Sequence, residues 1–283
     1  EKASFGSLFW KKQERTDDEM KRTIRKKNIR IVYSKRRDGD MLFKAEAPTP
    51  VNESFRLNRL KFFGANGIDP SKVVNIQAVH GTKIYRATKN DWGKGSLKPG
   101  TRVMGTDGLV TDLKKTWLMV TGADCLPVVL YDEKNGAAGI LHAGWRGIMR
   151  GIIGESFKTF SRQFGSKPRD VSVRIGPGIR RCHFEVKEDV AVQFQPKFGE
   201  MLSKKDGQLF LDLPGIVRKQ FTEIGIPEKN ISDSGECTYC DPKKWFSYRR
   251  DRPSYIEATA FLVSLERPVS RSELRKKKNI GRV

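Results

Sequence analysis

Residues 116–148, TWLMVTGADCLPVVLYDEKNGAAGILHAGWRGI, decide the fold class predicted for this chain. They contain two β-rich runs separated by Gly122–Pro127, a third run at 137–141, and an amphipathic stretch that begins near Ile148. Several strands therefore follow one another directly, while helices occur between others. This order predicts a mixed sheet in an α+β or α/β protein and does not favour a simple doubly wound fold.

Further strands and helices are predicted on both sides of this stretch. Alternating or β-rich runs predict strands at 28–34, 73–79, 171–175 and 256–266. Apolar residues at helical spacing predict helices at 53–67, about 148–164, 187–197 and 214–224. No G-x-G-x-x-G follows a strand in the right place, and the chain has no P-loop. The common nucleotide-binding folds are therefore excluded.

The composition is that of a globular protein. The chain has 283 residues, of which 37% are hydrophobic and 31% charged. No apolar run approaches the roughly 18 residues that a membrane span needs, so we expect no membrane association. Four cysteines do not make a disulfide scaffold, and a reduced, cytoplasmic setting is expected.

The net charge of +22 favours association with anions. Lysine and arginine gather at 21–37 and 271–283, which we interpret as solvated basic ends. The alternative is a nucleic-acid-binding arm, but no zinc finger, helix-turn-helix or aromatic RNP motif supports it. We predict a basic extension at 1–27, one catalytic domain at 28–266 and a basic tail at 267–283, in a monomer or homodimer.

Three residues have the pattern of a metal site. His80 and His142 each end an apolar β run and precede small residues, and Cys125 occupies a similar place before Leu126-Pro127. Catalytic zinc is commonly held by three ligands of these types, with a fourth position left for water. Each residue alone would more often be a packed side chain. Together they predict a metal site.

Seven motifs carry a resemblance to a known family: AVHGTKIY, TDGLVTD, GADCLPVVLYD, LHAGWRGI, GPGIRRCHFEV, CTYC and WFSYRRD. In their order and spacing they resemble the multicopper polyphenol oxidase or laccase-domain family. Its characterised members are purine nucleoside phosphorylases with adenosine deaminase activity. The resemblance implies an α+β, four-layer α/β/β/α sandwich with mixed sheets in a single domain. It also implies that His80, Cys125 and His142 bind one metal, zinc, with copper as the alternative.

The chain departs from the family pattern at several places. Ala78 stands where a glutamine is usual, and RPSYIEATAF (252–261) replaces the usual Thr-Gly-Arg. The N-terminal Gly-rich segment is reduced to SKRRDGDM and EAPTPVN. A four-copper laccase is excluded, because its copper sites need roughly ten histidines and this chain has three.

The implied reaction is phosphorolysis of adenosine, inosine or methylthioadenosine, with adenosine deamination as a second activity. Phosphorolysis needs cationic donors for phosphate, and Arg146 at a helix start is the candidate. Gly144 and Gly147 would let the backbone turn closely around the site, and Trp145 would pack beneath it or stack on a base. Asp124 is expected to assist proton transfer, to support the metal ligands, or only to cap a turn.

Other motifs leave alternatives open. Cys237 and Cys240 form a lone CxxC pair, which we interpret as structural or incidental, with metal binding and redox chemistry as alternatives. His183 is expected at the surface or in packing. Arg249 and Arg250 would bind phosphate or form ion pairs.

Two other functions remain open on the sequence. One is a Cys/His hydrolase with Cys125 as nucleophile, and the other is a non-catalytic binding protein with a basic surface. The deaminase signature H-x-E…P-C-x-x-C is not met, so deamination would need another general base.

Overall fold

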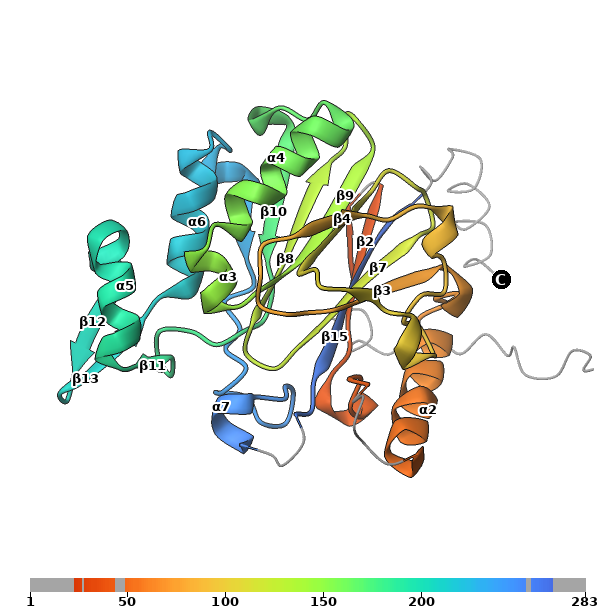
Figure 1. Cartoon of the computed structure of the whole chain (residues 1–283), viewed down its shortest axis with the longest axis horizontal. Helices are drawn as coiled ribbons and strands as arrows, with labels where there is room; N and C mark the ends of the chain where they lie inside the picture. The colour runs from red at the N-terminus through yellow and green to blue at the C-terminus, as the bar shows by residue number, and fades with distance from the viewer. Residues whose placement is uncertain (1–22, 27, 44–48, 253–255, 267–283) are drawn as a thin grey trace, which may run out of the picture.

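Two six-stranded sheets stack face to face in the computed structural model of the chain (Figure 1). The structure describes residues 23–26, 28–43, 49–252 and 256–266. The predicted strands and helices are confirmed as to type, with end points that shift by a few residues. Residues 1–22 and the predicted basic tail lie outside the described residues, and residues 23–26 form an edge strand within the predicted N-terminal extension. The interpretation of 21–37 as a solvated basic end is wrong for residues 29–33, which form a buried strand that includes Arg30.

The first sheet is mixed. Strand β3 pairs in parallel with β5 and β7, and the remaining pairs are antiparallel. The strands, in spatial order, are β1 (Thr23–Lys26), β2 (Ile29–Tyr33), β15 (Thr259–Leu265), β7 (Trp117–Gly122), β3 (Val73–Gln77) and β5 (Val103–Met104).

The second sheet is also mixed. Strands β10 and β14 pair in parallel, as do β4 and β6, whereas the central pairs are antiparallel. Its spatial order is β14 (Ile231–Asp233), β10 (Val171–Ile175), β8 (Leu126–Asp132), β9 (Ala137–Ala143), β6 (Gly108–Thr111) and β4 (Ile84–Arg86). All seven residues of β8 and of β9 are buried, as expected for strands covered on both faces.

Helices cover the two outer faces of the paired sheets (Figure 1). Helix α2 (Thr49–Ala65) packs on the first sheet through Phe62 and Phe63. Helices α3 (Trp145–Met149), α4 (Ile152–Phe164) and α6 (Leu213–Glu223) pack on the second. A separate apolar cluster fills the space between the sheets. These layers confirm the α+β, four-layer α/β/β/α architecture in a single domain.

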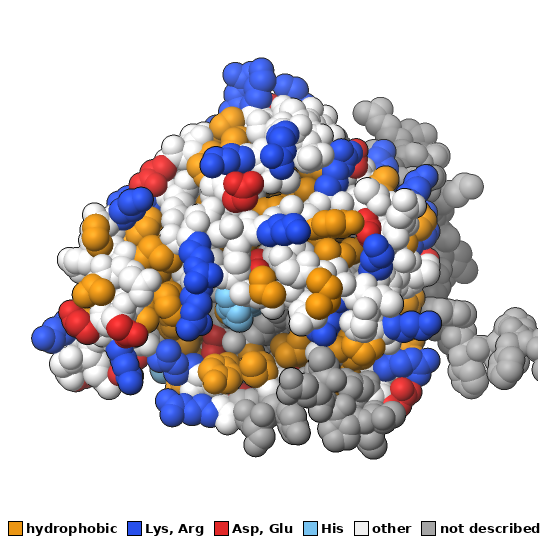
Figure 2. Space-filling view, in the orientation of Figure 1, with side chains coloured by type: hydrophobic (Ala, Val, Ile, Leu, Met, Phe, Trp, Pro, Cys, Tyr) orange, Lys and Arg blue, Asp and Glu red, His pale blue; other side chains and the backbone are white. Residues whose placement is uncertain are grey.

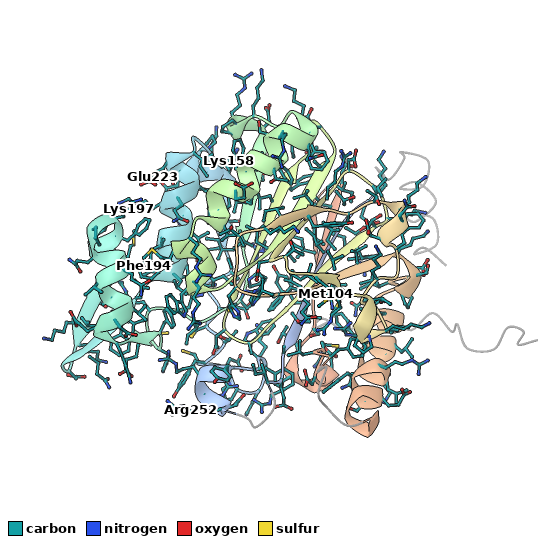
Figure 3. All side chains as sticks on the ribbon, viewed as in Figure 1. Met104, Lys158, Phe194, Lys197, Glu223 and Arg252 are labelled. Atoms are coloured by element: carbon teal, nitrogen blue, oxygen red, sulfur yellow. The ribbon has the colours of Figure 1, made fainter. Side chains whose placement is uncertain are left out.

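A small three-stranded sheet adjoins the second layer of helices. It contains β11 (Glu185–Val186), β13 (Gln208–Leu211) and β12 (Leu202–Lys205), and it lies beside α5 (Glu188–Phe198). Phe194 of α5 is fully buried, whereas Lys197 one turn later is exposed (Figure 3). This amphipathic face joins α5 to the same apolar core as the second sheet, so the unit is part of one domain.

Short helical segments complete the described structure. Helix α7 covers Tyr248–Asp251. Single 3-10 turns occupy Arg36–Asp38, Pro70–Lys72, Lys89–Asp91, Pro99–Thr101, Pro168–Asp170, Gly199–Met201 and Glu228–Asn230. Among the described helices, none has both the length and the apolarity that crossing a membrane requires.

The helix predicted from about Ile148 to Phe164 is wrong in one respect. It begins three residues earlier, at Trp145, and it breaks at Gly151, whose φ of 92° lies in the left-handed region. The residues expected to form a tight turn before the helix are therefore largely inside α3. Glycine can adopt this φ without a Cβ clash, so the break separates α3 from α4 at little cost.

Candidate metal centre and active site

His80, Cys125 and His142 come together where the two sheets meet. His80 follows β3 of the first sheet, and Cys125 lies in the turn that joins β7 to β8. His142 belongs to β9 of the second sheet. One ligand atom from each residue lies within 4.8 Å of the other two. Two imidazole nitrogens and one sulfur at this spacing form a donor set that suits zinc.

The backbone around His80 is held by a buried carboxylate. Asp107 accepts hydrogen bonds from three successive backbone N–H groups, those of Val79 at 3.2 Å, His80 at 2.8 Å and Gly81 at 2.7 Å. His80 has a φ of 57°, an unusual value for a residue with a Cβ. The three bonds to one carboxylate therefore stabilise a strained turn that presents the imidazole to the centre.

Asp107 also orients His142. Its carboxylate oxygen lies 3.1 Å from His142 Nδ1, and its carbonyl oxygen accepts the His142 backbone N–H at 2.8 Å. An ionised carboxylate can only accept, so Nδ1 carries a proton, and Nε2 is the nitrogen that would bind a metal once its own proton is lost. This is the carboxylate–histidine arrangement that supports metal-ligating imidazoles in many proteins. Asp107 was not among the site residues predicted from the sequence, although it lies within the motif TDGLVTD.

The centre favours a thiolate. Burial opposes ionisation of Cys125, but the charge and hydrogen bond of His142, with help from His80, outweigh it and lower the pKa of the thiol. Burial lowers the pKa of His142, while Cys125 and Asp107 raise it by more. Burial also raises the pKa of Asp107, yet hydrogen bonds from His142 and Gly81 leave it lowered. Thiolate, imidazolium and carboxylate thus stabilise one another before any cation binds.

Two glycines allow the chain to approach the centre closely. A Cβ on Gly144 would lie 2.8 Å from Cys125 Sγ and 3.0 Å from His80 Cδ2. A Cβ on Gly147 would lie 2.9 Å from the carbonyl oxygen of Gly81. The separations of 2.8 and 2.9 Å are too short for real contacts and that of 3.0 Å is very tight, so a larger residue at either position would displace the ligand segments.

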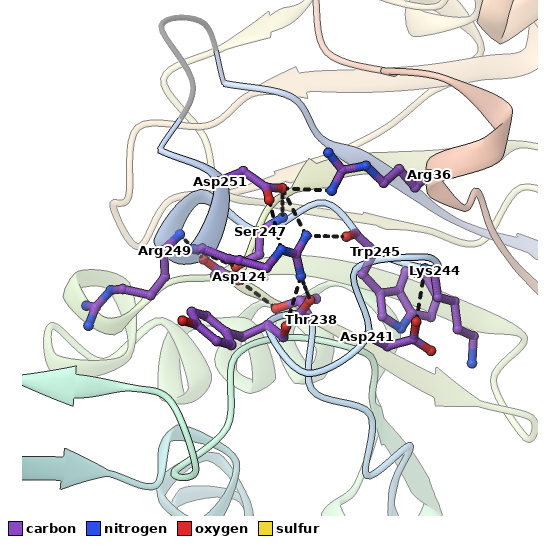
Figure 4. Close-up of polar contacts among 11 residues, drawn as sticks. Arg36, Asp124, Thr238, Asp241, Lys244, Trp245, Ser247, Arg249 and Asp251 are labelled. Atoms are coloured by element: carbon purple, nitrogen blue, oxygen red, sulfur yellow. Dashed lines mark hydrogen bonds and ion pairs between the residues drawn. The ribbon is translucent and has the colours of Figure 1, made fainter.

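Asp124, next to Cys125, connects the centre to the segment 237–251 (Figure 4). One carboxylate oxygen accepts the Thr238 hydroxyl at 2.6 Å, and the other accepts the backbone N–H of Arg249 at 2.8 Å. Its carbonyl oxygen accepts the N–H of Ile179 at 2.9 Å. Asp124 has a φ of 94°, so these bonds hold the Cys125 turn in a strained conformation.

Arg146 is exposed, and its guanidinium lies over the Trp145 ring at 4.4 Å. Trp145 is half-buried and packs on the core of the second sheet. No ion pair of Arg146 with a carboxylate occurs among the described residues. Among the described residues, no carboxylate therefore holds Arg146 in a purely structural role.

The two arginines of α7 differ in availability. Arg250 pairs with Asp251 and donates to the carbonyl oxygens of Thr238, Tyr239 and Trp245. Arg249 is half-buried and donates to the carbonyl of Glu185 at 2.8 Å. Arg250 is thus fully committed to bracing the loop, whereas Arg249 keeps donors for a ligand.

Figure 2 shows a histidine at the floor of a hollow, with hydrophobic side chains and basic side chains at its margin. Val79, next to His80, leaves 52% of its surface exposed. A cavity of about 660 Å³ lies elsewhere and is lined in part by Arg180, Cys182 and Arg218. His80, Cys125 and His142 do not line that cavity. We therefore locate the candidate active site by the chemistry of these three side chains and not by the size of a cavity.

His183 and the CxxC pair lie together with Cys182, as a second group of ligand atoms within 4.8 Å of one another. This group shares no residue with the first. The sequence predicted Cys237–Cys240 as a lone pair and gave no role to Cys182, although Cys182 directly precedes His183 in the motif RRCHFEV.

Residues 49–261 match the family described as multi-copper polyphenol oxidoreductase laccase, and the chain belongs to this family. The purine nucleoside phosphorylase YlmD of Geobacillus stearothermophilus is 35% identical over 194 residues, which are 67% of this chain and 71% of that protein. Its Bacillus subtilis counterpart is 33% identical over 61% of this chain, a match that spans 64% of that protein. The crystal structure of the Geobacillus YlmD has a TM-score of 0.79 and 27% identity, over 84% of this chain and 92% of that one.

Proposed function

We propose that this protein is a zinc-dependent purine nucleoside phosphorylase. The convergence of His80, Cys125 and His142 on one point is the observation that carries the proposal. Support comes from the relatives, which are named purine nucleoside phosphorylases. The substrates would be a purine nucleoside, such as adenosine, inosine or methylthioadenosine, and inorganic phosphate. Adenosine deamination is proposed as a second activity at the same site.

The donor set fits zinc, with copper as the alternative. His142 and His80 would each supply an imidazole nitrogen and Cys125 a thiolate. Asp107 supports this assignment because it fixes the Nδ1–H form of His142. When bound, zinc would supply a Lewis acid with one open position beside the substrate. Asp107 and Asp124 would act as positioning residues, since each holds a ligand segment by hydrogen bonds.

In the proposed reaction a phosphate oxygen forms a bond to C1′ of the ribose as the bond from C1′ to the purine nitrogen breaks. The leaving base takes up a proton, which balances the proton that hydrogen phosphate gives up as it becomes the ribose 1-phosphate ester. Arg146 is proposed to hold the phosphate because it is exposed and lies two residues after Gly144, where an added Cβ would meet Cys125 and His80. Arg249, with donors still available, is the second candidate.

The cellular setting, the assembly state and the domain limits are proposed as well. All four cysteines are free thiols, which supports function in a reducing, cytoplasmic setting. A monomer or homodimer, and the domain limits 28–266, stay predictions.

The Cys/His hydrolase remains the competing enzyme, because Cys125 is a low-pKa thiol beside two imidazoles. The non-catalytic binding protein remains the competing non-enzyme.

One experiment separates these functions. Purified protein is assayed for metal content and for base release from adenosine and inosine, with and without phosphate. Phosphate-dependent release of ribose 1-phosphate that a chelator abolishes and zinc restores is the expected result. Phosphate-independent hydrolysis that survives the chelator but stops on alkylation of Cys125 would indicate the hydrolase. A metal-loaded protein without turnover of either nucleoside would indicate a binding protein.

A further inference from the structure

A second set of ligand side chains lies outside the proposed active site. Cys182 and His183 lie between β10 and β11, and Cys237 and Cys240 follow β14. Their ligand atoms all lie within 4.8 Å of one another. We propose that these four residues form a structural zinc site, distinct from the centre at His80, Cys125 and His142.

The spacing of the ligand atoms is close to that of a tetrahedral site. With zinc–sulfur bonds of about 2.3 Å and zinc–nitrogen bonds of about 2.0–2.1 Å, tetrahedral ligands lie roughly 3.5–3.8 Å apart. Cys182 Sγ lies 3.6 Å from Cys240 Sγ, and His183 Nδ1 lies 3.3 Å from the first sulfur and 3.2 Å from the second. A disulfide would need about 2.05 Å, so the sulfurs are spaced for a shared ion and not for a bond.

The CxxC turn is tied to the segment that precedes Cys182 and His183. Gly178 and Cys237 form a parallel bridge, and the N–H of Thr238 donates to the Gly178 carbonyl at 3.1 Å. A turn fixed in this way is the kind of support that metal ligands receive.

His183 and two arginines complete the support. The His183 ring stacks on Tyr239, with centroids 4.0 Å apart and an interplanar angle of 16°. Arg250 donates to the carbonyls of Thr238 and Tyr239 at 2.7 and 2.9 Å, and Arg180 donates to that of Glu236 at 3.1 Å. Both arginines are themselves paired with aspartates, Arg250 with Asp251 and Arg180 with Asp233, so each holds a carbonyl of the turn in a fixed position.

Neither core packing nor a redox pair accounts for the cluster. Cys182 and Cys240 are exposed, so they do not fill the core, and exposed free thiols are reactive. A redox CxxC pair needs no third thiol and no imidazole against it. Four protein ligands leave no open position, so the site would be structural. Zinc binding here releases the thiol protons and needs no oxidant.

The test is a count of metal ions on the full chain after purification with zinc and a reductant. Two zinc ions per chain are expected, reduced to one by Cys240→Ser and to one by Cys125→Ser, while the exposed Lys243→Ala keeps both. X-ray absorption should give about two sulfurs per zinc in the wild type, averaged over one-sulfur and three-sulfur sites, and about one in Cys240→Ser.

The wild-type measurement keeps the proposal testable if Cys240→Ser does not fold. One zinc per chain, with about one sulfur around it, would overturn the proposal. So would a disulfide between any two of Cys182, Cys237 and Cys240 in the reduced, zinc-supplemented protein, detected by mass spectrometry. Neither readout depends on turnover, so an inactive protein that holds two zinc ions would contradict the proposed phosphorylase function and support the structural site.

Discussion

Asp107 contacts His142 twice, through its carboxylate at Nδ1, 3.1 Å away, and through its carbonyl oxygen at the backbone N–H, 2.8 Å away. The same carboxylate binds the backbone of Val79, His80 and Gly81. One buried side chain therefore sets the position of two ligands that lie 62 positions apart in the chain, as their numbers 80 and 142 show. No other described carboxylate contacts both.

Asp107→Asn should weaken zinc binding by about 10–100-fold, because an amide cannot accept from every donor and no longer fixes His142 in the Nδ1–H form. Competition with a chelator of known affinity measures the change. Asp112→Asn is the matched control, since Asp112 is exposed and pairs only with Arg86. An unchanged affinity in Asp107→Asn would contradict the orienting role.

Gly144→Ala should reduce zinc affinity and activity. The backbone of Gly144 has φ −79° and ψ 164°, which alanine adopts easily, so the effect comes from the added Cβ beside Cys125 and His80. Displacing those atoms should cost about 1–3 kcal/mol. Gly154→Ala has no atom within 4 Å to displace and should gain up to about 1 kcal/mol of stability. Zinc content and the thermal unfolding temperature are measured for both variants. If the two variants do not differ in these quantities, the centre tolerates a Cβ at position 144.

The Cys125 thiol of the metal-free protein should titrate near pH 6. Its folded-state pKa is lowered, so the stability it contributes is present above the unfolded pKa and is lost as the pH falls through about 6. His142 has the opposite sign, since its raised pKa makes a contribution that is lost as the pH rises through about 10. The alkylation rate of the Cys125 peptide, followed by mass spectrometry, measures the thiol. In His142→Gln, the pH midpoint of the Cys125 alkylation rate should move upward. An unchanged midpoint would show that His142 does not stabilise the Cys125 thiolate.

Arg146→Lys should raise the KM for phosphate while zinc content stays unchanged, because lysine keeps the charge but loses the planar pair of donors. Arg146→Ala should raise it by roughly 10–100-fold, the range for a lost charge-assisted hydrogen bond. Arg150→Ala, exposed one turn later, is the control. If stability falls and phosphate dependence does not change, Arg146 has a structural role and the phosphate contact should be sought at Arg249.

Thr238→Val should destabilise the Cys125 turn by about 1–3 kcal/mol, because the carboxylate of Asp124 loses the donor at 2.6 Å. Zinc affinity of the first centre should fall with it. Thr222→Val removes a comparable hydroxyl from the surface of α6, where it donates to the Arg218 carbonyl, and should have little effect. Urea unfolding of the two variants measures the difference; similar losses would show that Asp124 does not depend on Thr238.

The apolar runs predicted the strands, a mixed sheet and the position of three side chains near strand ends, whereas the four-layer arrangement was expected only from the resemblance to the family. Apolar runs report buried strands, and His80, Cys125 and His142 each lie at the boundary of such a run. No sequence pattern identifies Asp107 as a site residue, because a single aspartate before a glycine is common in turns of every kind. Asp107 directly precedes β6. It reaches both histidines only because β6 pairs in parallel with β4 and antiparallel with β9 in the folded protein.

The second cluster could not be predicted for a related reason. Its two halves, at Cys182 and at Cys237, are joined by the parallel pairing of β10 with β14, which leads both segments to the same end of the sheet. A spacing of 55 positions between the halves matches no short zinc motif. The helix break at Gly151 was missed because a single glycine is tolerated inside many helices, and its left-handed φ is a property of the folded chain.

The first centre draws on both sheets: His80 extends from one, His142 lies on the other, and Cys125 lies on the link between them. A chain in which only one sheet has formed would lack at least one of the three donors. Tight uptake of the proposed metal would therefore follow docking of the two sheets, which would make it a late event in folding. Once bound, the ion would connect the layers of the sandwich directly, and its removal should loosen their contact at this edge before either sheet comes apart.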